Sequence, residues 1–475
     1  MSLENENQMV EWDGEENAIG YTFPEADELA ELIKERRFQA FRKETENIPP
    51  SHLAQIIDGL PSDMASIFFR LLPKELAAEV FVEMDADSCR QLITLFTDKE
   101  LSALLSELYL DDTVDIIEEM PAAVVKRILK NTSREDRESI NLLLRYPKDS
   151  AGTIMTTEYV RLRGSMTVAE ALAHIREVAI DKETIYTSYV TDDKKKLLGI
   201  VTAKRLLLAS PEDTIDSVME DRVIFATTDE DREEVALKFE KYGFISLPVV
   251  DKELRLVGIV TVDDAIGVLK EEVEEDISRM AAIIPDDTPY LKQSAFSIFK
   301  SRIPWLLFLM ISATFTGVVL SFFEGNLIPV LTIFVPMLMD TGGNSGSQTS
   351  VTVIRAIGSG SISFRDVPIM LFKELRVGIL CGISLGAVAF GKIMLVDRLL
   401  MNNPSVTVFV AFAASVTLAL TVIIAKLVGC LLPALAKRIG LDPAVMASPL
   451  ITTIVDVLAL LIYFAVSANL FGLVA

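Results

Sequence analysis

Hydrophobic residues recur at helical spacing in the first third of the chain, and the pattern repeats every twelve residues. From residue 60 to 143, seven successive segments each begin with a large apolar or turn residue. A capping-type residue or proline follows, and then apolar side chains three or four positions apart. Pro61, Pro73 and Pro121 suit a first helical turn, where the missing N–H costs nothing. We expect seven short helices stacked as an all-α solenoid, with a plain helical bundle as the alternative.

A longer repeat comes next, because residues 153–208 parallel residues 217–269. Each half holds a β-type run, Tyr186–Val190 or Phe244–Val250, and then a Gly-Ile-Val-Thr strand that enters a helix. The doubled pattern resembles a tandem CBS pair, an α/β regulatory module that often binds nucleotides or ions. Such modules are expected to pack on each other and to dimerise.

Five apolar stretches occupy the last part of the chain, and each can cross a hydrocarbon layer of about 30 Å, which needs about 20 residues. They are residues 303–323, 328–355, 368–396, 405–435 and 446–473. We therefore expect an all-α domain with five membrane helices. Basic residues gather on the side of the preceding soluble part, which places the N-terminus in the cytoplasm and the C-terminus outside.

Charge divides the chain in the same way. Residues 301–475 carry ten Lys/Arg and seven Asp/Glu, which leaves 35 basic and 61 acidic residues in 1–300. So acidic a soluble part argues against nucleic acid as a partner and suits cations. Three distant cysteines form neither a disulfide framework nor a zinc ribbon. The first residues lack a basic and an apolar signal region, so we expect the soluble part to stay in the cytoplasm.

The second apolar stretch is interrupted by "MDTGGNSGSQTS" at residues 339–350. Gly343 and Gly346 can let backbones approach or expose carbonyl groups, while Asn344 and Gln348 offer neutral oxygens and amides. Small residues also serve plain helix packing in membranes. Packing alone does not require the amides, so we interpret this segment as the lining of a pore.

An acid lies about ten residues inside the fifth stretch. A central Asp costs about 2.5–3.5 kcal/mol on insertion scales, so Asp456 is a functional candidate. Thr452 and Ser448, four and eight residues earlier, share its helical face. One carboxylate with neutral oxygens suits Mg²⁺, which keeps several waters and takes only one or two carboxylates. The alternative is that Asp456 pairs with a basic residue such as Lys426 to hold the helices together.

These features together resemble the MgtE family of magnesium channels. The resemblance runs from the solenoid to the C-terminus and rests on "DSAGTIMTTEYV" (149–160), "GIVTVDDAIGVLKEEVEEDI" (258–277), "VPMLMDTGGNSGSQ" (335–348) and "DPAVMASPLITTIVD" (442–456). It implies a homodimer in the inner membrane, in contact with lipid. It also implies an acidic disordered lead (1–20), a helical N domain (21–148), tandem CBS modules (149–270), a plug helix (271–300) and a five-helix pore domain (301–475).

The resemblance further implies that Asp456 is the main pore acid and that cytosolic Mg²⁺ binds between the N, CBS and plug elements and holds the pore shut. The positions that match the family's metal-binding acids are Asp111 or Asp112, Asp231, Glu233, Asp264, Glu272, Glu275, Asp276 and Asp442. Glu272, Glu275 and Asp276 share one helical face, where like charges repel unless water or bound cations screen them.

Two departures from the family pattern change the expectations. Gly243 and Gly267 stand where some relatives have acids, so one or two sensing sites are weaker or missing. Some relatives bind ATP at the first CBS module through an aromatic residue and an Arg-Asp pair. Here those positions hold Thr187, Lys204 and Arg205, so we expect no ATP at this site.

Other functions fit less well. A transition-metal transporter would need soft or imidazole ligands, yet His52 and His174 lie outside the apolar stretches; Co²⁺ remains an alternative cargo. A membrane-anchored metal sensor would explain the acids near 272–276 but not Asp456. No phosphate loop, nucleophile elbow or metal-hydrolase spacing indicates an enzyme.

Overall fold

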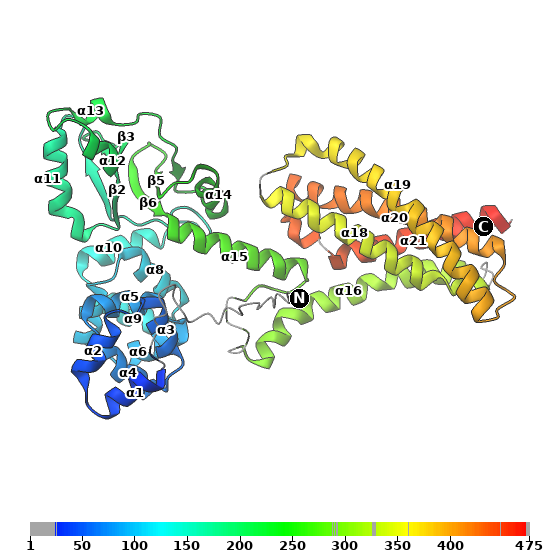
Figure 1. Ribbon diagram of the computed structural model, residues 1–475, viewed down its shortest axis with the longest axis horizontal. Coiled ribbons are helices and arrows are strands. Elements are labelled where there is room, and N and C mark those ends of the chain that lie inside the picture. Colours follow the sequence, from blue (N-terminus) through cyan, green and yellow to red (C-terminus); the bar gives the residue numbers. More distant parts are fainter. Residues whose placement is uncertain are drawn as a thin grey trace, which may run out of the picture. The chain divides into compact units, whose positions relative to one another are not determined.

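The computed structural model describes residues 24, 26–286, 288, 290, 293–324, 329–359, 361–446 and 448–471 (Figure 1). The chain divides into two compact units, residues 1–268 and 269–475. The acidic lead expected at 1–20 lies outside the described residues. The boundary between the units falls inside one helix, α15 (Val262–Met280).

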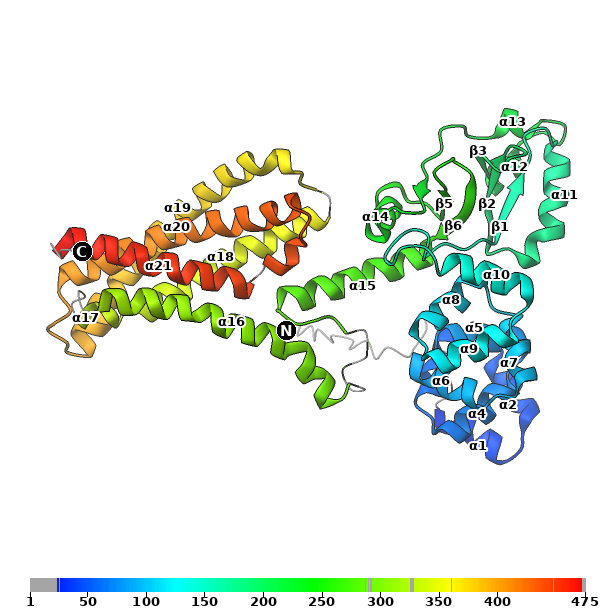
Figure 2. The same ribbon diagram turned by 180° about the vertical axis from the view of Figure 1, so that it is seen from behind.

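Short helices form the first part of unit 1 (Figure 2). They are α1 (Ala26–Lys34), α2 (Phe38–Thr45), α3 (Pro50–Asp58), α4 (Ser62–Leu71), α5 (Lys74–Val82), α6 (Ala86–Leu95), α7 (Asp98–Leu105), α8 (Leu110–Glu119), α9 (Ala122–Asn131) and α10 (Arg134–Leu143). Helices α4 to α10 begin at twelve-residue intervals throughout a stretch that is described in full. The seven helices predicted from the repeat are therefore confirmed.

Local chemistry explains where these helices begin. Pro61, Pro73 and Pro121 each stand at the N-cap with extended backbone, so each opens a helix without breaking one. Thr97 and Glu100 form a capping box at the start of α7. The apolar face of each helix then enters a shared core.

Two three-stranded sheets follow in unit 1, with strand orders β1-β2-β3 and β4-β5-β6. The strands are β1 (Tyr159–Leu162), β2 (Thr184–Thr191), β3 (Leu197–Thr202), β4 (Ala226–Thr227), β5 (Ser246–Val250) and β6 (Leu256–Thr261). In both sheets the first pair is parallel and the second antiparallel. The helices are α11 (Val168–Val178), α12 (Ala203–Leu208), α13 (Ile215–Val218) and α14 (Arg232–Tyr242). The doubled α/β module is confirmed.

Unit 2 is helical. It contains the end of α15, then α16 (Ala295–Glu324), the short α17 (Pro329–Thr332), α18 (Val335–Gly358), α19 (Val367–Lys392), a π-helical turn (Ile393–Leu400), α20 (Val408–Arg438) and α21 (Ser448–Phe471). Helix α15, which begins directly after β6, ends at Met280, short of residue 300, and Ala282 has a positive φ of 56°.

Four of the described helical segments are long and apolar enough to span a membrane: Ala295–Phe322, Phe364–Leu400, Val408–Arg438 and Pro443–Phe471. Helix α18 has the length but carries the polar "DTGGNSGSQTS" segment. It also begins at Val335, later than the apolar stretch, because α17 is a separate turn. The expected membrane helices thus exist as helices, and the polar one is distinguished by its composition.

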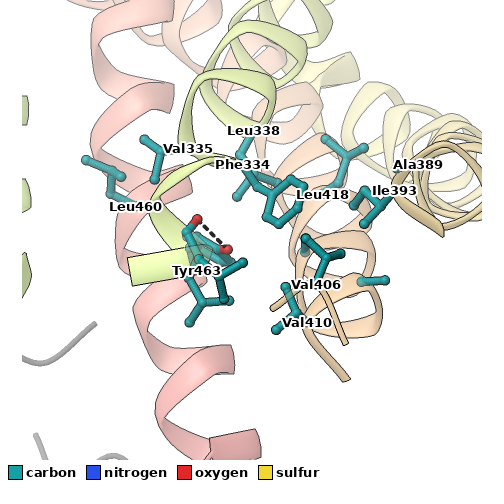
Figure 3. Packing of buried hydrophobic residues seen from close by; sticks show 14 of the residues in the cluster. Phe334, Val335, Leu338, Ala389, Ile393, Val406, Val410, Leu418, Leu460 and Tyr463 are labelled. Carbon is teal, nitrogen blue, oxygen red and sulfur yellow. Dashed lines mark hydrogen bonds between the residues drawn. The ribbon is translucent and has the colours of Figure 1, made fainter. Parts of the chain in front are cut away.

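The core of unit 2 lies where α18, α20 and α21 meet (Figure 3). Phe334 and Leu338 pack there against Leu418 and Leu460. The Tyr463 hydroxyl donates a 2.8 Å hydrogen bond to the Leu331 carbonyl oxygen, which satisfies a buried phenol. This packing holds one end of α18 and α21 together and positions the residues that follow on both.

Candidate pore and cation-binding sites

Helix α18 packs against α20 and α21 through glycine residues. A Cβ on Gly343 would lie 3.0 Å from Thr452 Cγ2, and a Cβ on Gly429 of α20 would overlap the Gly346 carbonyl oxygen. Both α18 glycines are buried. The structure thus places Gly343 and Gly346 in the helix interface, where small residues allow close approach.

A different face of α18 is polar and exposed within the unit. Asp340, Asn344 and Gln348 follow at four-residue spacing, which puts them on one side of the helix, and all three are exposed. We call these three residues the polar face of α18. Polar groups at membrane depth need protein or water around them, so this face is not suited to lipid.

Asp456 of α21 lies beside the polar face of α18. Its carboxylate is half-buried and interacts electrostatically with Asp340. One turn away, Thr452 is half-buried and its hydroxyl donates a 2.9 Å hydrogen bond to the Pro449 carbonyl oxygen. The side chain of Ser448 lies outside what the structure describes. Two acids and neutral oxygens are therefore gathered from two helices.

Lys426, the basic residue that could have paired with Asp456, contacts a different group. Its ammonium lies 3.4 Å from Thr349 Oγ1, and that hydroxyl donates a 3.0 Å hydrogen bond to Glu374 Oε2. This arrangement could not be predicted from the sequence, because its three residues come from α20, α18 and α19.

A second group of acids lies within unit 1. Asp111 and Asp112 stand in the first turn of α8, Glu158 and Glu183 flank the first sheet, and Asp264 stands in the first turn of α15. We call these five residues the α8 acid cluster. Their charges act on one another, and Lys182 is the base that acts on Glu158.

Burial and mutual repulsion shift the titration of the α8 acid cluster. Burial first and neighbouring carboxylates second raise the pKa of Asp112 and of Glu158 to about 7, and that of Glu183 to about 8. Burial also raises the pKa of Asp264 to about 6, although the Thr261 hydroxyl opposes the shift. At neutral pH the cluster therefore holds protons or needs a cation.

Two oxygens of this cluster have no hydrogen-bond partner in the described part of the chain. Asp111 Oδ1 and Glu158 Oε2 are both buried without a hydrogen bond, although Thr156 bonds the carboxyl group of Asp111. An unsatisfied buried carboxylate oxygen is costly, and a divalent cation is one way to satisfy it.

The structure brings together some of the predicted acids and adds others. Asp111, Asp112 and Asp264 lie close enough for their charges to interact, whereas Glu158 and Glu183 were not predicted from the sequence. Both lie near strands, far along the chain from α8. Asp115, four residues after Asp111, is exposed and close enough for their charges to interact. Its i, i+4 spacing was a signal that could have found it.

The acids of α15 in unit 2 have a basic partner. The Arg279 guanidinium forms ion pairs with both Glu275 and Asp442. Asp442 also accepts a 2.7 Å hydrogen bond from the Ala444 backbone N–H. Burial, with the Asp442 charge second, raises the pKa of Asp276. Met280 packs on Ile354 and Ala444, so the end of α15 rests on α18 and the turn before α21.

The remaining predicted acids have structural positions of their own. Asp231 caps α14, where its Oδ1 accepts a 2.8 Å hydrogen bond from the Glu233 N–H. Glu233 stands in the first turn of that helix and Glu272 in the middle of α15. Gly243, where some relatives have an acid, ends α14 with a φ of 66°. Across the described residues, no three His, Cys, Asp or Glu side chains are close enough to hold a metal ion.

The three residues at the positions where some relatives bind ATP make other contacts here or are exposed. Thr187 is buried in β2. Arg205 donates a 3.1 Å hydrogen bond to the Val218 carbonyl oxygen and lies 3.5 Å from Glu220. Lys204 is exposed.

Comparisons with known proteins give the class of this chain. Residues 335–466 match a family described as "Divalent cation transporter", residues 48–149 match "MgtE intracellular N domain", and residues 151–212 and 215–271 match "CBS domain". The chain thus has the make-up of a divalent cation transporter with a regulatory CBS pair.

Individual relatives are similar over most of their length. The chain is 36% identical to the magnesium transporter MgtE of Thermus thermophilus, over 92% of this chain and 97% of that protein. It is 28% identical to the soluble part of a magnesium transporter, with a TM-score of 0.50, covering 52% of this chain and 97% of that one. The cytosolic domain of the Mg²⁺ channel MgtE in complex with ATP is 38% identical, with coverages of 51% and 99% and a TM-score of 0.49. The chain belongs to the MgtE family.

Proposed function

We propose that this protein is a homodimeric Mg²⁺ channel that cytosolic Mg²⁺ closes. The observation that carries the proposal is the gathering of Asp456 and Thr452 beside the polar face of α18. These groups are exposed or half-buried within one chain, although they occur in helices of a membrane domain. A water-filled path accounts for such groups at membrane depth.

The composition of this site favours a hydrated divalent cation. One Asp456 per chain becomes two around a two-fold axis, and Mg²⁺ takes one or two carboxylates while it keeps several waters. Amide and hydroxyl oxygens of the polar face and Thr452 can hold those waters. Soft ligands that would select a transition metal are absent from this list.

Regulation rests on the acids outside the membrane helices. The carboxylates of the α8 acid cluster repel one another where they are ionised. Glu272, Glu275 and Asp276 lie on one side of α15. We infer that Mg²⁺ at these acids stabilises the closed channel and that the repulsion returns when Mg²⁺ leaves. We further propose that the chain lies in the inner membrane, with its N-terminus in the cytoplasm and its C-terminus outside, and that ATP has no part in gating.

The test is cation flux into liposomes that hold the purified full-length protein. Asp456→Asn keeps the side-chain shape but removes the charge that compensates the ion's partial dehydration, so Mg²⁺ flux should be abolished. The variant should fold at least as well as the wild type, because the wild-type acid is costly in a membrane. Asp366→Asn, which changes a half-buried carboxylate in the turn ahead of α19, is the matched control and should conduct normally.

The same assay separates the alternatives. Equal flux of Co²⁺ and Mg²⁺ would indicate a broader divalent cation transporter. Mg²⁺ binding without any flux would indicate a membrane-anchored sensor. A folded Asp456→Asn protein that conducts Mg²⁺ normally would end the assignment of this acid to the pore.

A further inference from the structure

Lys426 is a buried cation in the middle of a membrane helix. Its side chain is 6% exposed, and it stands on α20 between Thr421 and Gly429, which both face α18. A charged residue in such a place is costly and needs a partner, so it is a functional candidate by default. It has no role in the cation path proposed above.

The partner is reached through a threonine. The Lys426 ammonium donates to Thr349 Oγ1 at 3.4 Å, and the same hydroxyl donates to Glu374 Oε2 at 3.0 Å. Thr349 is 3% exposed. A hydroxyl that accepts from a cation and donates to an anion is polarised in both directions, which strengthens the two bonds. We call Lys426, Thr349 and Glu374 the α18 clamp, because they join α18 to α20 and α19.

The middle of α18 has few side chains to fix its rotation. Leu338 packs in the core at one end and Val353 packs with Cys430 at the other. Between them the close contacts with α20 and α21 are made by glycines, which have no side chains to interlock. Membrane helices gain no hydrophobic free energy by leaving lipid for each other, so polar bonds and close packing decide their position. Both kinds of contact meet on the α18 side that bears Gly346 and Thr349.

The α18 clamp sets the rotation of α18 and therefore the direction in which the polar face of α18 points. Gln348 immediately precedes Thr349, and each residue turns the α-helix by about 100°. A rotation of α18 that moved Thr349 away from Glu374 would therefore turn Gln348 and Asn344 by the same angle. The next residue, Ser350, donates a 3.2 Å hydrogen bond to the Met446 carbonyl oxygen. This bond joins the same part of α18 to the turn before α21.

From this geometry we infer that Lys426 is a positioning residue for ion conduction. It holds Thr349 together with Glu374 and so orients the polar face of α18 toward the ion. The inference rests on the proposed Mg²⁺ channel function, but it predicts effects of residues that no ion touches.

Thr349→Val is the sharpest test, because it removes the shared hydroxyl and keeps the side-chain shape. The full-length protein in liposomes should lose about tenfold in maximal Mg²⁺ flux per folded protein, and its ratio of Mg²⁺ to Co²⁺ flux should change. Thr349→Ser keeps the hydroxyl and should restore both. Thr417→Val is the matched control, since Thr417 is a buried threonine whose hydroxyl bonds Ala413 O at 2.8 Å in its own helix; it should behave as wild type.

A second pair of variants covers the case in which Thr349→Val does not fold. Lys426→Met should lower flux as Thr349→Val does. Lys426→Met combined with Glu374→Gln rebalances the charge without the ammonium, so flux should stay low if orientation depends on the clamp. Recovery of wild-type flux and ion ratio in this double variant would show charge balance alone and overturn the inference.

The remaining outcomes are also decisive. If Thr349→Val lowers the unfolding temperature but leaves flux per folded protein and the ion ratio unchanged, the clamp only stabilises the bundle and the inference is wrong. If wild-type protein carries no Mg²⁺ in the same liposomes, the proposed function fails instead, so the two failures are distinguishable.

Discussion

Two groups of acids, one in each unit of this protein, differ in how the negative charge of their carboxylates is compensated. The α8 acid cluster of unit 1 holds five carboxyl groups, with Lys182 as the base that acts on Glu158. In unit 2, Glu275 and Asp442 share the Arg279 guanidinium. In the first group the repulsion between carboxylates raises their pKa values, so they take up protons. In the second group the carboxylates already form ion pairs with Arg279.

This contrast decides at which acids Mg²⁺ would bind more tightly. In the α8 acid cluster a bound cation would replace repulsion between carboxylates and would satisfy a buried oxygen of Asp111. Around Asp442 a cation must first displace Arg279, so part of its Coulomb energy is spent on the broken ion pair. We therefore expect the α8 acid cluster to bind Mg²⁺ more tightly, and the acids around Arg279 to fill at higher concentrations.

The largest expected effect is on local opening of α8. Mg²⁺ at a hundred times its dissociation constant should lower the population of the open state about hundredfold, because binding to the folded state alone adds about 2.7 kcal/mol. Hydrogen exchange of α8 amides in the full-length protein, with Mg²⁺ or with EDTA, measures this directly. Asp112→Asn/Asp264→Asn should lose the Mg²⁺ effect, while Glu135→Gln on α10 should keep it.

The pH dependence of the same measurement has a definite sign. The folded pKa values of Asp112 and Glu183, about 7 and about 8, lie above those of unfolded carboxyl groups. The folded state therefore binds more protons between those values, and in EDTA its stability falls as pH rises toward 8. Protection of α8 in EDTA that rose with pH, after correction for intrinsic exchange, would contradict the proposed repulsion.

The next effect is on channel closure. Changing Glu272 and Glu275 to Gln and Asp276 to Asn removes three carboxylates from one side of α15. The Mg²⁺ concentration that halves flux should rise about tenfold, which is a typical coupling between a regulatory site and a response. Flux in liposomes with controlled internal Mg²⁺ gives this concentration, with Glu274→Gln as the control. An unchanged concentration would exclude these acids from sensing.

Replacing Arg279 should change the Mg²⁺ concentration that halves flux in the opposite direction and by a smaller factor. Arg279→Gln frees Glu275 and Asp442 for Mg²⁺, so the half-inhibiting concentration should fall by about threefold, as suits a partly exposed ion pair. Lys270→Gln removes an exposed base from the same helix and should have no effect. If Arg279→Gln instead raised that concentration, the arginine would itself stabilise the closed state, and the comparison between the two acid groups would fail.

Periodic features could be predicted from the sequence and most contacts could not. The twelve-residue spacing gave helices α4 to α10, because each short helix carries its own cap and apolar face. The composition of residues 339–350 set α18 apart from the other membrane helices. Asp456 was found from the rule that an acid is costly at membrane depth.

Most contacts could not be predicted because residues that are far apart in the sequence carry no local signal of their contact. Glu158 reaches α8 from another domain, and Lys426 finds Thr349 on a different helix. The buried Gly343 and Gly346 show a second limit. Glycine serves a pore and a helix interface equally well in a sequence, and only the neighbouring atoms tell which contact is made.

The smallest expected effect is that of ATP, for which we predict none. Thr187 is buried and Arg205 contacts Val218 and Glu220. These two positions therefore offer neither the aromatic face nor the carboxylate through which some relatives bind ATP. Calorimetry on the full-length protein with millimolar ATP should show no binding, and ATP should leave the Mg²⁺ response of flux unchanged. Both the aromatic residue and the carboxylate of the relatives' site are replaced in this chain, by Thr187 and Arg205. Arg205→Asp alone should therefore not gain ATP binding. Sub-millimolar binding to the wild type would show that this chain holds the nucleotide through other residues.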